Sequence, residues 1–168
     1  MADIEIRPVR EGDAQELSTL LNEIIARGGT TAWEDPFEPE LLARIMLTGP
    51  DVICCFVAAE LAIDRLLGFQ SLLMSKDLPD GVVDITTFAR VGLTQRGVGS
   101  CLFAATQAEA GRRNFAAINA TIRADNTGGL TFYGRMGFVD HSVRRAVPLK
   151  DGTSVDRVSK RYSLKSNI

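Results

Sequence analysis

Residues 93–103 read LTQRGVGSCLF and place two glycines, Gly97 and Gly99, where a strand-like run meets a helix-like run. A helix that begins at such a turn has backbone N–H groups without intrahelical partners, and its dipole is positive at that end. Because glycine has no side chain, a ligand can approach these donors closely. The turn therefore favours a phosphate or pyrophosphate site, although a tight turn that binds nothing would use the same glycines.

Two common phosphate-binding motifs do not fit this turn. A P-loop requires Gly-Lys followed by Ser or Thr, and the turn has no lysine. A dinucleotide-binding turn requires a third glycine three positions after Gly99, where this sequence has Leu102. Neither a P-loop nor a Rossmann site is therefore expected.

A second patterned segment, DNTGGLTFYGRMGF, follows at residues 125–138, with Asn126 at the start of a predicted helix. Together the two segments resemble the GNAT superfamily of acyl-CoA-dependent N-acyltransferases. In that family a Q/R-x-x-G-x-G/A turn binds the coenzyme A pyrophosphate, and an N-x-x-A-x-x-x-Y-x-x-x-G-F segment follows the next strand. Asn126, Tyr133 and the Gly-Phe pair at 137–138 match the second pattern, whereas Gly129 replaces the usual alanine. The resemblance extends over most of the chain and implies acetyl-CoA as co-substrate.

The resemblance also implies which residues contact the coenzyme. They are Phe88, Ala89, Arg90, Val91, Gln95, Arg96, Gly97, Val98, Gly99, Ser100 and Asn126. The first position of the turn motif is Thr94 rather than Gln or Arg, so Arg96 is the candidate for a charge-assisted bond to the pyrophosphate. Asn126 would serve equally well as a plain helix N-cap.

Within the superfamily, TTAWEDPF at residues 30–37 and VVDITTFA at residues 82–89 resemble the phosphinothricin-acetyltransferase branch. Members of that branch acetylate free amino groups of small amino-acid-like compounds. They carry an acidic residue on the strand that leads into the glycine turn, and Asp84 stands at that position where the branch usually has Glu. The shorter carboxylate would need a closer substrate or a bridging water.

The implied chemistry assigns roles to particular side chains. An amine is protonated near neutral pH, so its attack on a thioester requires a base. Asp84 is the first candidate for that base; Glu34, Asp35 or a water chain are the alternatives. Tyr133 would donate a proton to the departing thiolate, and a backbone N–H within residues 88–91 would bind the oxyanion.

The acceptor amine is expected to contact Trp33, Glu34 and Thr86. Each candidate has a structural alternative that the residues alone leave open. Asp84 could be a solvated strand residue, Tyr133 could pack its ring, and Trp33 could belong to the core.

These residues need a mixed α/β (α+β) framework to bring them together. Period-2 patterns and β-branched runs predict strands, and period-3.6 patterns predict helices. The predicted order is β-α-α-β-β-β-α-β-α-β-β, with Asp13 and Glu16 forming a capping box on the first helix. The resemblance adds that the sheet is splayed at its centre and carries helices on both faces.

Composition narrows the function classes. The net charge is −2, and 24% of residues are charged with the two signs interspersed, which gives no indication of nucleic-acid or membrane binding. No group of residues has metal-ligand spacing, so no metal is expected. Residues 1–168 are expected to form a single domain, and the N-terminus lacks a signal pattern, which favours a cytoplasmic protein. The resemblance also implies a homodimer.

The sequence therefore predicts an acetyl-CoA-dependent N-acetyltransferase that acts on the primary amine of a small, amino-acid-like molecule. Two alternatives remain. One is an enzyme of the same fold that acetylates a protein N-terminus or lysine. The other is a regulatory acyl-CoA binder without catalysis, which Thr94 and the shortened Asp84 keep open.

Overall fold

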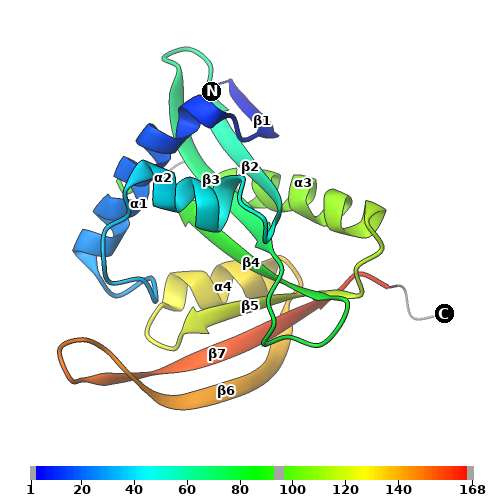
Figure 1. Ribbon diagram of the computed structural model, residues 1–168. Helices are drawn as coiled ribbons and strands as arrows, with labels where there is room; N and C mark the ends of the chain where they lie inside the picture. The colour runs from blue at the N-terminus through cyan, green and yellow to red at the C-terminus, as the bar shows by residue number, and fades with distance from the viewer. Residues whose placement is uncertain (1–2, 93–96, 166–168) are drawn as a thin grey trace.

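The computed structural model describes residues 3–92 and 97–165 (Figure 1). The strands are β1 (Ile4–Pro8), β2 (Val52–Glu60), β3 (Arg65–Leu73), β4 (Val82–Ala89), β5 (Ala117–Arg123), β6 (Val139–Pro148) and β7 (Ser154–Ser163). The helices are η1 (Glu11–Asp13), α1 (Ala14–Arg27), α2 (Pro39–Leu42), its continuation η2 (Ala43–Leu47), α3 (Val98–Arg112) and α4 (Thr127–Arg135). The predicted order of strands and α-helices is confirmed.

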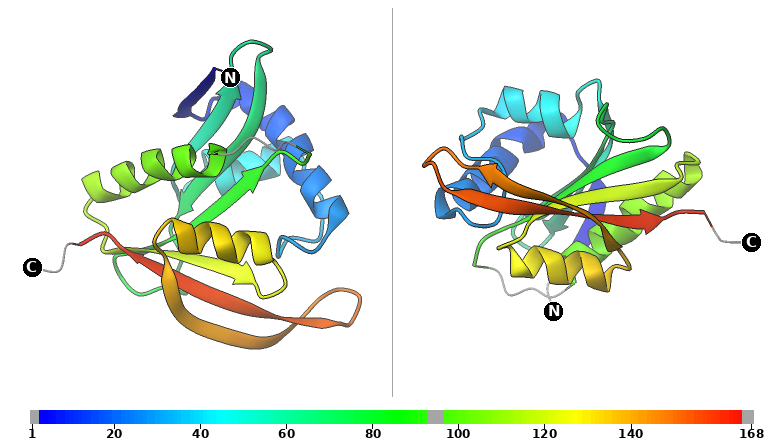
Figure 2. Two further views of the ribbon diagram at one scale, coloured as in Figure 1. Left: turned by 180° about the vertical axis from the view of Figure 1, so that it is seen from behind. Right: turned by 90° about the horizontal axis from the view of Figure 1, so that it is seen from below.

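All the strands form one mixed sheet in the order β1-β2-β3-β4-β5-β7-β6. Each neighbouring pair is antiparallel except β4 and β5, which are parallel. Helices α1 and α2 cover one face, and α3 and α4 cover the other, as the front and back views show (Figure 2). The predicted fold class is therefore confirmed.

The parallel strands β4 and β5 stay paired only over a short stretch. Their register runs from Val82 opposite Ala117 to Asp84 opposite Asn119. The rest of β4 keeps pairing with β3 as far as Ala89, while β5 keeps pairing with β7 as far as Arg123. The sheet therefore opens at its centre beyond Asp84, as the splayed GNAT-type sheet requires.

Alternation along β4 assigns its side chains to two layers. Val83 and Ile85 are buried with the residues of β5 that pack beneath α3 and α4. Phe88 belongs to the opposite core, which the apolar side of α1 completes. Because side chains alternate along a strand, Asp84 and Thr86 share the α1/α2 face with Phe88. Strand β4 thus presents the polar side chains of Asp84 and Thr86 to the α1/α2 layer, beside the opening between β4 and β5.

The predicted capping box at the start of α1 is wrong. Asp13 occupies the N-cap position but makes no side-chain cap bond. Its carboxylate accepts from Arg10 N at 2.7 Å and from Arg7 Nη1 at 2.8 Å. Glu16 accepts from the backbone N–H of Leu66 at 2.8 Å. Asp13 therefore binds residues that precede it, at the η1 turn, and Glu16 binds strand β3 instead of the start of its own helix.

In residues 3–92 and 97–165, no helix combines the length and the apolar character that crossing a bilayer requires.

Candidate active site

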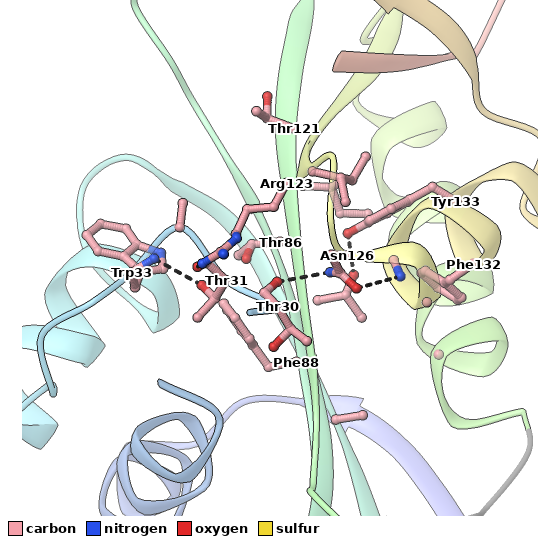
Figure 3. A pocket seen from close by; sticks show the side chains of 18 of the residues that line it. Thr30, Thr31, Trp33, Thr86, Phe88, Thr121, Arg123, Asn126, Phe132 and Tyr133 are labelled. Atoms are coloured by element: carbon pink, nitrogen blue, oxygen red, sulfur yellow. Dashed lines mark hydrogen bonds between the residues drawn. The ribbon is translucent and has the colours of Figure 1, made fainter. Parts of the chain in front are cut away.

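A pocket of about 500 Å³ lies at the opening between β4 and β5 (Figure 3). The loop at 30–33, strand β4 from Asp84 to Ala89 and the end of β5 line one part of it. Gly99 of α3 and residues of α4, including Phe132 and Tyr133, line another part. Because these two groups belong to opposite faces of the sheet, the pocket extends through the gap and can receive one reactant from each side.

Asp84 lies on the wall of this pocket at the point where the two strands separate. Asn119 Nδ2 donates to Asp84 Oδ1 at 2.9 Å. Burial raises the pKa of the Asp84 carboxyl above its ordinary value; the hydrogen bond from Asn119 and the charge of Arg161 act against that rise. A carboxyl whose pKa is raised, beside a cavity, is suited to accept a proton.

Tyr133 reaches the pocket from α4 (Figure 3), and it belongs to the core on the face of the sheet opposite to that of Asp84. Its hydroxyl oxygen lies 2.9 Å from Thr87 Oγ1, and Gln70 Nε2 donates to that same Thr87 oxygen at 2.9 Å. A Thr87 hydroxyl that donates to Tyr133 leaves the phenolic proton available to a group in the pocket. Burial raises the pKa of Tyr133 well above its ordinary value, so the phenol stays protonated near neutral pH.

The glycine turn begins α3 as the sequence predicts. Gly97 has a φ of +97°, a left-handed conformation that favours glycine. Gly97, Gly99 and Ser100 line a cavity of about 620 Å³, which α4 completes with residues including Arg135. This cavity shares Gly99 with the central pocket, so the two sites adjoin.

Of the three other predicted residues of the turn, Val98 lies within the described residues. The Val98 side chain is buried with Ala58, Leu67 and Leu102, so only its backbone remains available to a ligand. The predictions for Gln95 and Arg96 fall outside the described residues.

The end of β4 divides the predicted coenzyme contacts into two groups. Phe88 and Ala89 line the central pocket, and Val91 joins them around an adjoining cavity of about 390 Å³. Arg90 lines neither: its Nη2 donates to Glu16 Oε1 at 2.7 Å. The Arg90 side chain is therefore directed at α1.

Backbone geometry narrows the choice of oxyanion donor. Arg90 N donates to the carbonyl oxygen of Leu67 on β3 at 2.7 Å. Because N–H groups alternate in direction along a strand, those of Thr87 and Ala89 are directed toward the opening on the β5 side. Ala89 N–H is thus the donor within residues 88–91 that best fits the predicted role.

Asn126 is the N-cap of α4 and also holds the loop before α2. Its Oδ1 accepts from Gly129 N at 2.9 Å, and its Nδ2 donates to Thr30 O at 2.9 Å. Asn126 lines the central pocket as well (Figure 3). The cap that the sequence left as an alternative is present, and its contact with a coenzyme stays a prediction.

Two of the three predicted acceptor-binding residues line the pocket. Thr86 lies on the same face of β4 as Asp84, and Trp33 packs edge-on against Phe37 at 5.0 Å between ring centroids. Glu34 is not among the lining residues. Its carboxylate accepts from Lys150 N at 3.1 Å, so it joins this loop to the β6–β7 turn.

Sequence reasoning did not identify Thr87, Gln70, Asn119 or Arg123 as part of the site. Arg123 lines the pocket, and its Nη2 donates to Asp125 Oδ2 at 2.8 Å. Asn119 carried a usable signal, because it is a polar residue inside the otherwise apolar run of a buried strand. Thr87 and Gln70 are cross-strand partners on β4 and β3, and Arg123 donates to Thr31 O in a distant loop. No local pattern reveals these contacts.

Within the described ranges, no group of three or more His, Cys, Asp or Glu side chains is placed to hold a metal ion.

Several solved structures that resemble this chain are N-acetyltransferases. An N-acetyltransferase from Staphylococcus aureus Mu50 has a TM-score of 0.83 at 17% sequence identity, over 98% of this chain and 100% of that chain. A GNAT superfamily phosphinothricin acetyltransferase from Sinorhizobium meliloti, solved in complex with acetyl-CoA, has a TM-score of 0.83 at 16% identity, over 95% of this chain and 88% of that chain. A ribosomal-protein-alanine N-acetyltransferase from Brucella melitensis has a TM-score of 0.80 at 18% identity, over 95% of this chain and 99% of that chain.

No protein-family model and no curated protein sequence matches the chain. At these low identities the likeness concerns three-dimensional structure, and it extends over nearly the whole chain. This chain therefore has the fold of the GNAT N-acetyltransferases.

Proposed function

We propose that this protein is an N-acetyltransferase that transfers the acetyl group of acetyl-CoA directly to the primary amine of a small, amino-acid-like molecule. The observation that carries the proposal is the pocket through the splayed sheet, with Asp84 on its wall and Tyr133 reaching it from the opposite face. The Sinorhizobium meliloti structure, solved with acetyl-CoA, supports the choice of acyl donor.

The acyl donor would enter from the α3/α4 face. The turn at Gly97 and Gly99 supplies backbone N–H groups at a helix N-terminus for the pyrophosphate. The pantetheine amides would pair with the exposed backbone of Thr87 and Ala89, much as an added strand would. This arrangement directs the thioester toward Tyr133.

The acceptor would enter from the α1/α2 face. Asp84 takes a proton from the substrate ammonium, directly or through a water, and the free amine attacks the thioester carbonyl carbon. The N–H of Ala89 donates to the oxyanion of the tetrahedral intermediate. As the C–S bond breaks, Tyr133 donates its proton to the departing sulfur, which leaves coenzyme A and an N-acetyl product.

The charges around Arg123 support an acceptor that carries a carboxylate. Arg157 lies opposite Arg123 in the β5–β7 register and is buried. Burial lowers the pKa of the Arg157 guanidinium, and the nearby charge of Arg123 lowers it further. The charges of Asp125 and Glu34 offset part of this repulsion between the two cations, and an anionic substrate group near Arg123 would offset more of it.

The loop that covers the pocket supports a small acceptor over a protein. Asn126 Nδ2 donates to the carbonyl oxygen of Thr30 at 2.9 Å. Arg123 Nη1 donates to the carbonyl oxygen of Thr31 at 3.3 Å. Held in this way, the loop and Trp33 form one wall of the pocket (Figure 3). The likeness to the Brucella melitensis ribosomal-protein-alanine N-acetyltransferase keeps peptide acceptors among those to be tested.

The first test is thiol release from acetyl-CoA with a panel of amines, with coenzyme binding measured by calorimetry in parallel. The panel holds the common amino acids, methionine sulfoximine and sulfone, phosphinothricin, polyamines and short peptides. Turnover of one amino-acid-like amine supports the proposal, and turnover of peptides alone replaces it with a protein acetyltransferase.

Two variants then separate catalysis from binding. Asp84→Asn and Tyr133→Phe should lose turnover while they still bind acetyl-CoA. Binding by the wild type without turnover of any acceptor would favour a regulatory acyl-CoA binder, and absence of binding would contradict the assignment of the glycine turn.

We further propose a cytoplasmic homodimer. Cell fractionation and light scattering on purified protein test the location and the dimer separately.

A further inference from the structure

Three polar side chains lie in a row on the α1/α2 face of strands β4, β5 and β7. The register places Asp84 opposite Asn119 and Asn119 opposite Arg161. Arg161 Nε donates to Asn119 Oδ1 at 2.8 Å, and Asn119 Nδ2 donates to Asp84 Oδ1 at 2.9 Å. The row therefore links a permanent cation to the pocket carboxylate through one neutral amide.

The orientation of the Asn119 amide follows from its two neighbours. Arginine has only donors, so the amide oxygen faces Arg161 and the NH₂ group faces Asp84. The same nitrogen donates to Thr121 Oγ1 at 3.2 Å, so both ends of the amide are held. Asn119 is only 2% exposed, so water competes little for these bonds.

We infer that Arg161 and Asn119 are positioning residues that keep the Asp84 carboxylate ionised and directed into the pocket. This inference rests on the proposed role of Asp84 as the base. A direct Arg–Asp pair would occupy both carboxylate oxygens in a bidentate contact. The amide bridge engages Oδ1, and Asn119 is the one described side chain that donates to this carboxylate; the backbone N–H of Ile85 is a further donor to it. Without a bidentate side-chain partner, the carboxylate keeps lone pairs for the substrate ammonium.

Burial raises the pKa of Asp84, and the row formed by Asn119 and Arg161 opposes that rise. The charge that acts on this carboxyl is that of Arg161 from β7. Tyr133 from α4 is a neutral phenol, and the charge of Asp84 contributes to its raised pKa. Arg123 of β5 is the other charged residue that lines the pocket, and Leu73 of β3 and Met46 of η2 add apolar side chains. Burial raises the pKa of Asp84, and the Asn119 hydrogen bond and the Arg161 charge lower it. Without the row, a larger fraction of Asp84 would be protonated and unable to act as a base.

The test is a carboxyl ¹³C NMR titration of Asp84 in the full-length protein labelled at aspartate, with Asp84→Asn to assign the signal. Asn119→Leu should raise the pKa of Asp84 by about one pH unit or more, since a hydrogen bond to a charged group contributes about 1.5–3 kcal/mol. Arg161→Met should raise it by a smaller amount, and Arg161→Lys should restore most of the wild-type value.

Tyr162→Phe is the matched control, because it removes a β7 hydrogen bond to Gln107 without touching the row. Its Asp84 should titrate as in the wild type. An unchanged Asp84 pKa in both Asn119→Leu and Arg161→Met would overturn the inference. Should Asn119→Leu fail to fold, Arg161→Met still decides, because Asn119 stays in place.

The pH dependence of kcat/KM gives the second readout. In Asn119→Leu the acid limb of the kcat/KM profile should move to higher pH by as much as the Asp84 pKa measured by NMR. At pH values well above that limb, kcat/KM should return toward the wild-type value. If kcat/KM of Asn119→Leu fell by the same factor at every pH, Asn119 would have a purely structural role, which would contradict the inference. If the wild type transfers no acetyl group, the proposed function fails, while the titration still tests the row by itself.

Discussion

Asp84 and Tyr133 approach one pocket from opposite faces of the sheet, and neither is in an ordinary environment. Burial raises the pKa of both side chains, so each holds its proton more tightly than in water. For Tyr133 this retains the proton that, in the proposed mechanism, passes to the departing thiolate. For Asp84 it makes the carboxylate a stronger base, at a cost to stability above its pKa.

The stability cost at Asp84 is measurable. Because the folded pKa is raised, protonation of Asp84 stabilises the fold at low pH, and that stabilisation is lost as the pH rises through the raised pKa. Asp84→Asn should therefore raise the Tm at pH 7 and above while acetyl transfer is lost. Calorimetric melting of both proteins between pH 4 and pH 8 measures this difference. The increase in Tm of Asp84→Asn over the wild type should become smaller toward low pH.

Asp151→Asn is the control for this stability effect. Hydrogen bonds from Thr153 lower the pKa of Asp151, the opposite direction from Asp84. The control should show no gain in Tm at pH 7. An equal gain at every pH in Asp84→Asn would argue against a buried charge as the cause.

Thr87 should matter for the chemical step rather than for binding. Thr87→Val keeps the side-chain shape but removes the hydroxyl between Gln70 and Tyr133. We expect kcat to fall about tenfold, the loss of one hydrogen bond that stabilises the transition state, with the KM for acetyl-CoA nearly unchanged. Thr87→Ser should keep most of the activity. A rise in KM alone would place Thr87 in binding instead.

At the scale of the elements, two helix N-termini meet at the edge of the pocket. Gly99 near the start of α3 lies so close to α4 that an added Cβ would stand 2.7 Å from Phe132 Cε2. At the start of α4, a Cβ on Gly129 would stand 2.5 Å from Asn126 Nδ2. In this chain a Cβ at position 129 would therefore require the capping Asn126 side chain to shift.

Gly129→Ala should disturb that cap. The new methyl group would displace the Asn126 amide from Thr30 and from the helix N-terminus, at a cost of about 1 kcal/mol in the free energy of unfolding. Urea denaturation measures the loss. In Gly128→Ala the nearest atom, Asn126 Oδ1, would be 3.8 Å away, so this control should lose no stability. Equal losses in both variants would contradict the steric explanation.

The elements were more predictable than the partners of individual side chains. Alternation in β4 and the glycines before α3 are local patterns, and they predict the strand, the turn and the helix. Asp13 was assigned wrongly because Arg7 and the Arg10 N–H compete for its carboxylate. Thr87 was missed because its role depends on Gln70 and Tyr133, which only the assembled fold brings next to it. Asn119 was missed although it is a polar residue in an otherwise apolar strand.

At the scale of the whole molecule, the loop before α2 connects distant parts of the chain. Glu34 accepts from Lys150 N at 3.1 Å, and Asp35 forms an ion pair with the Lys150 side chain. The loop thereby spans from α1 to the β6–β7 turn and passes beside the pocket (Figure 1). Contacts far from Asp84 thus hold the wall of the acceptor side.

Lys150→Ala should loosen that wall without unfolding the protein. Because the Lys150–Asp35 pair is exposed, its loss should change the free energy of unfolding by less than about 1 kcal/mol. We expect the KM for the amine to rise a few-fold, with acetyl-CoA affinity unchanged. Steady-state kinetics and calorimetry separate the two. Arg145→Ala is the control, because it breaks another exposed ion pair, the one with Asp156. It should change neither the KM for the amine nor the affinity for acetyl-CoA.

The opening between β4 and β5 also constrains the kinetic order of the reaction. Since the proposed donor and acceptor reach the gap from opposite faces, neither has to bind first, and neither product has to wait for the other to leave. Initial-rate plots should intersect rather than run parallel, as for a ternary complex. Free coenzyme A should compete with acetyl-CoA, and the acetylated product should compete with the amine. The split in the sheet would then give each substrate its own entrance and its own exit.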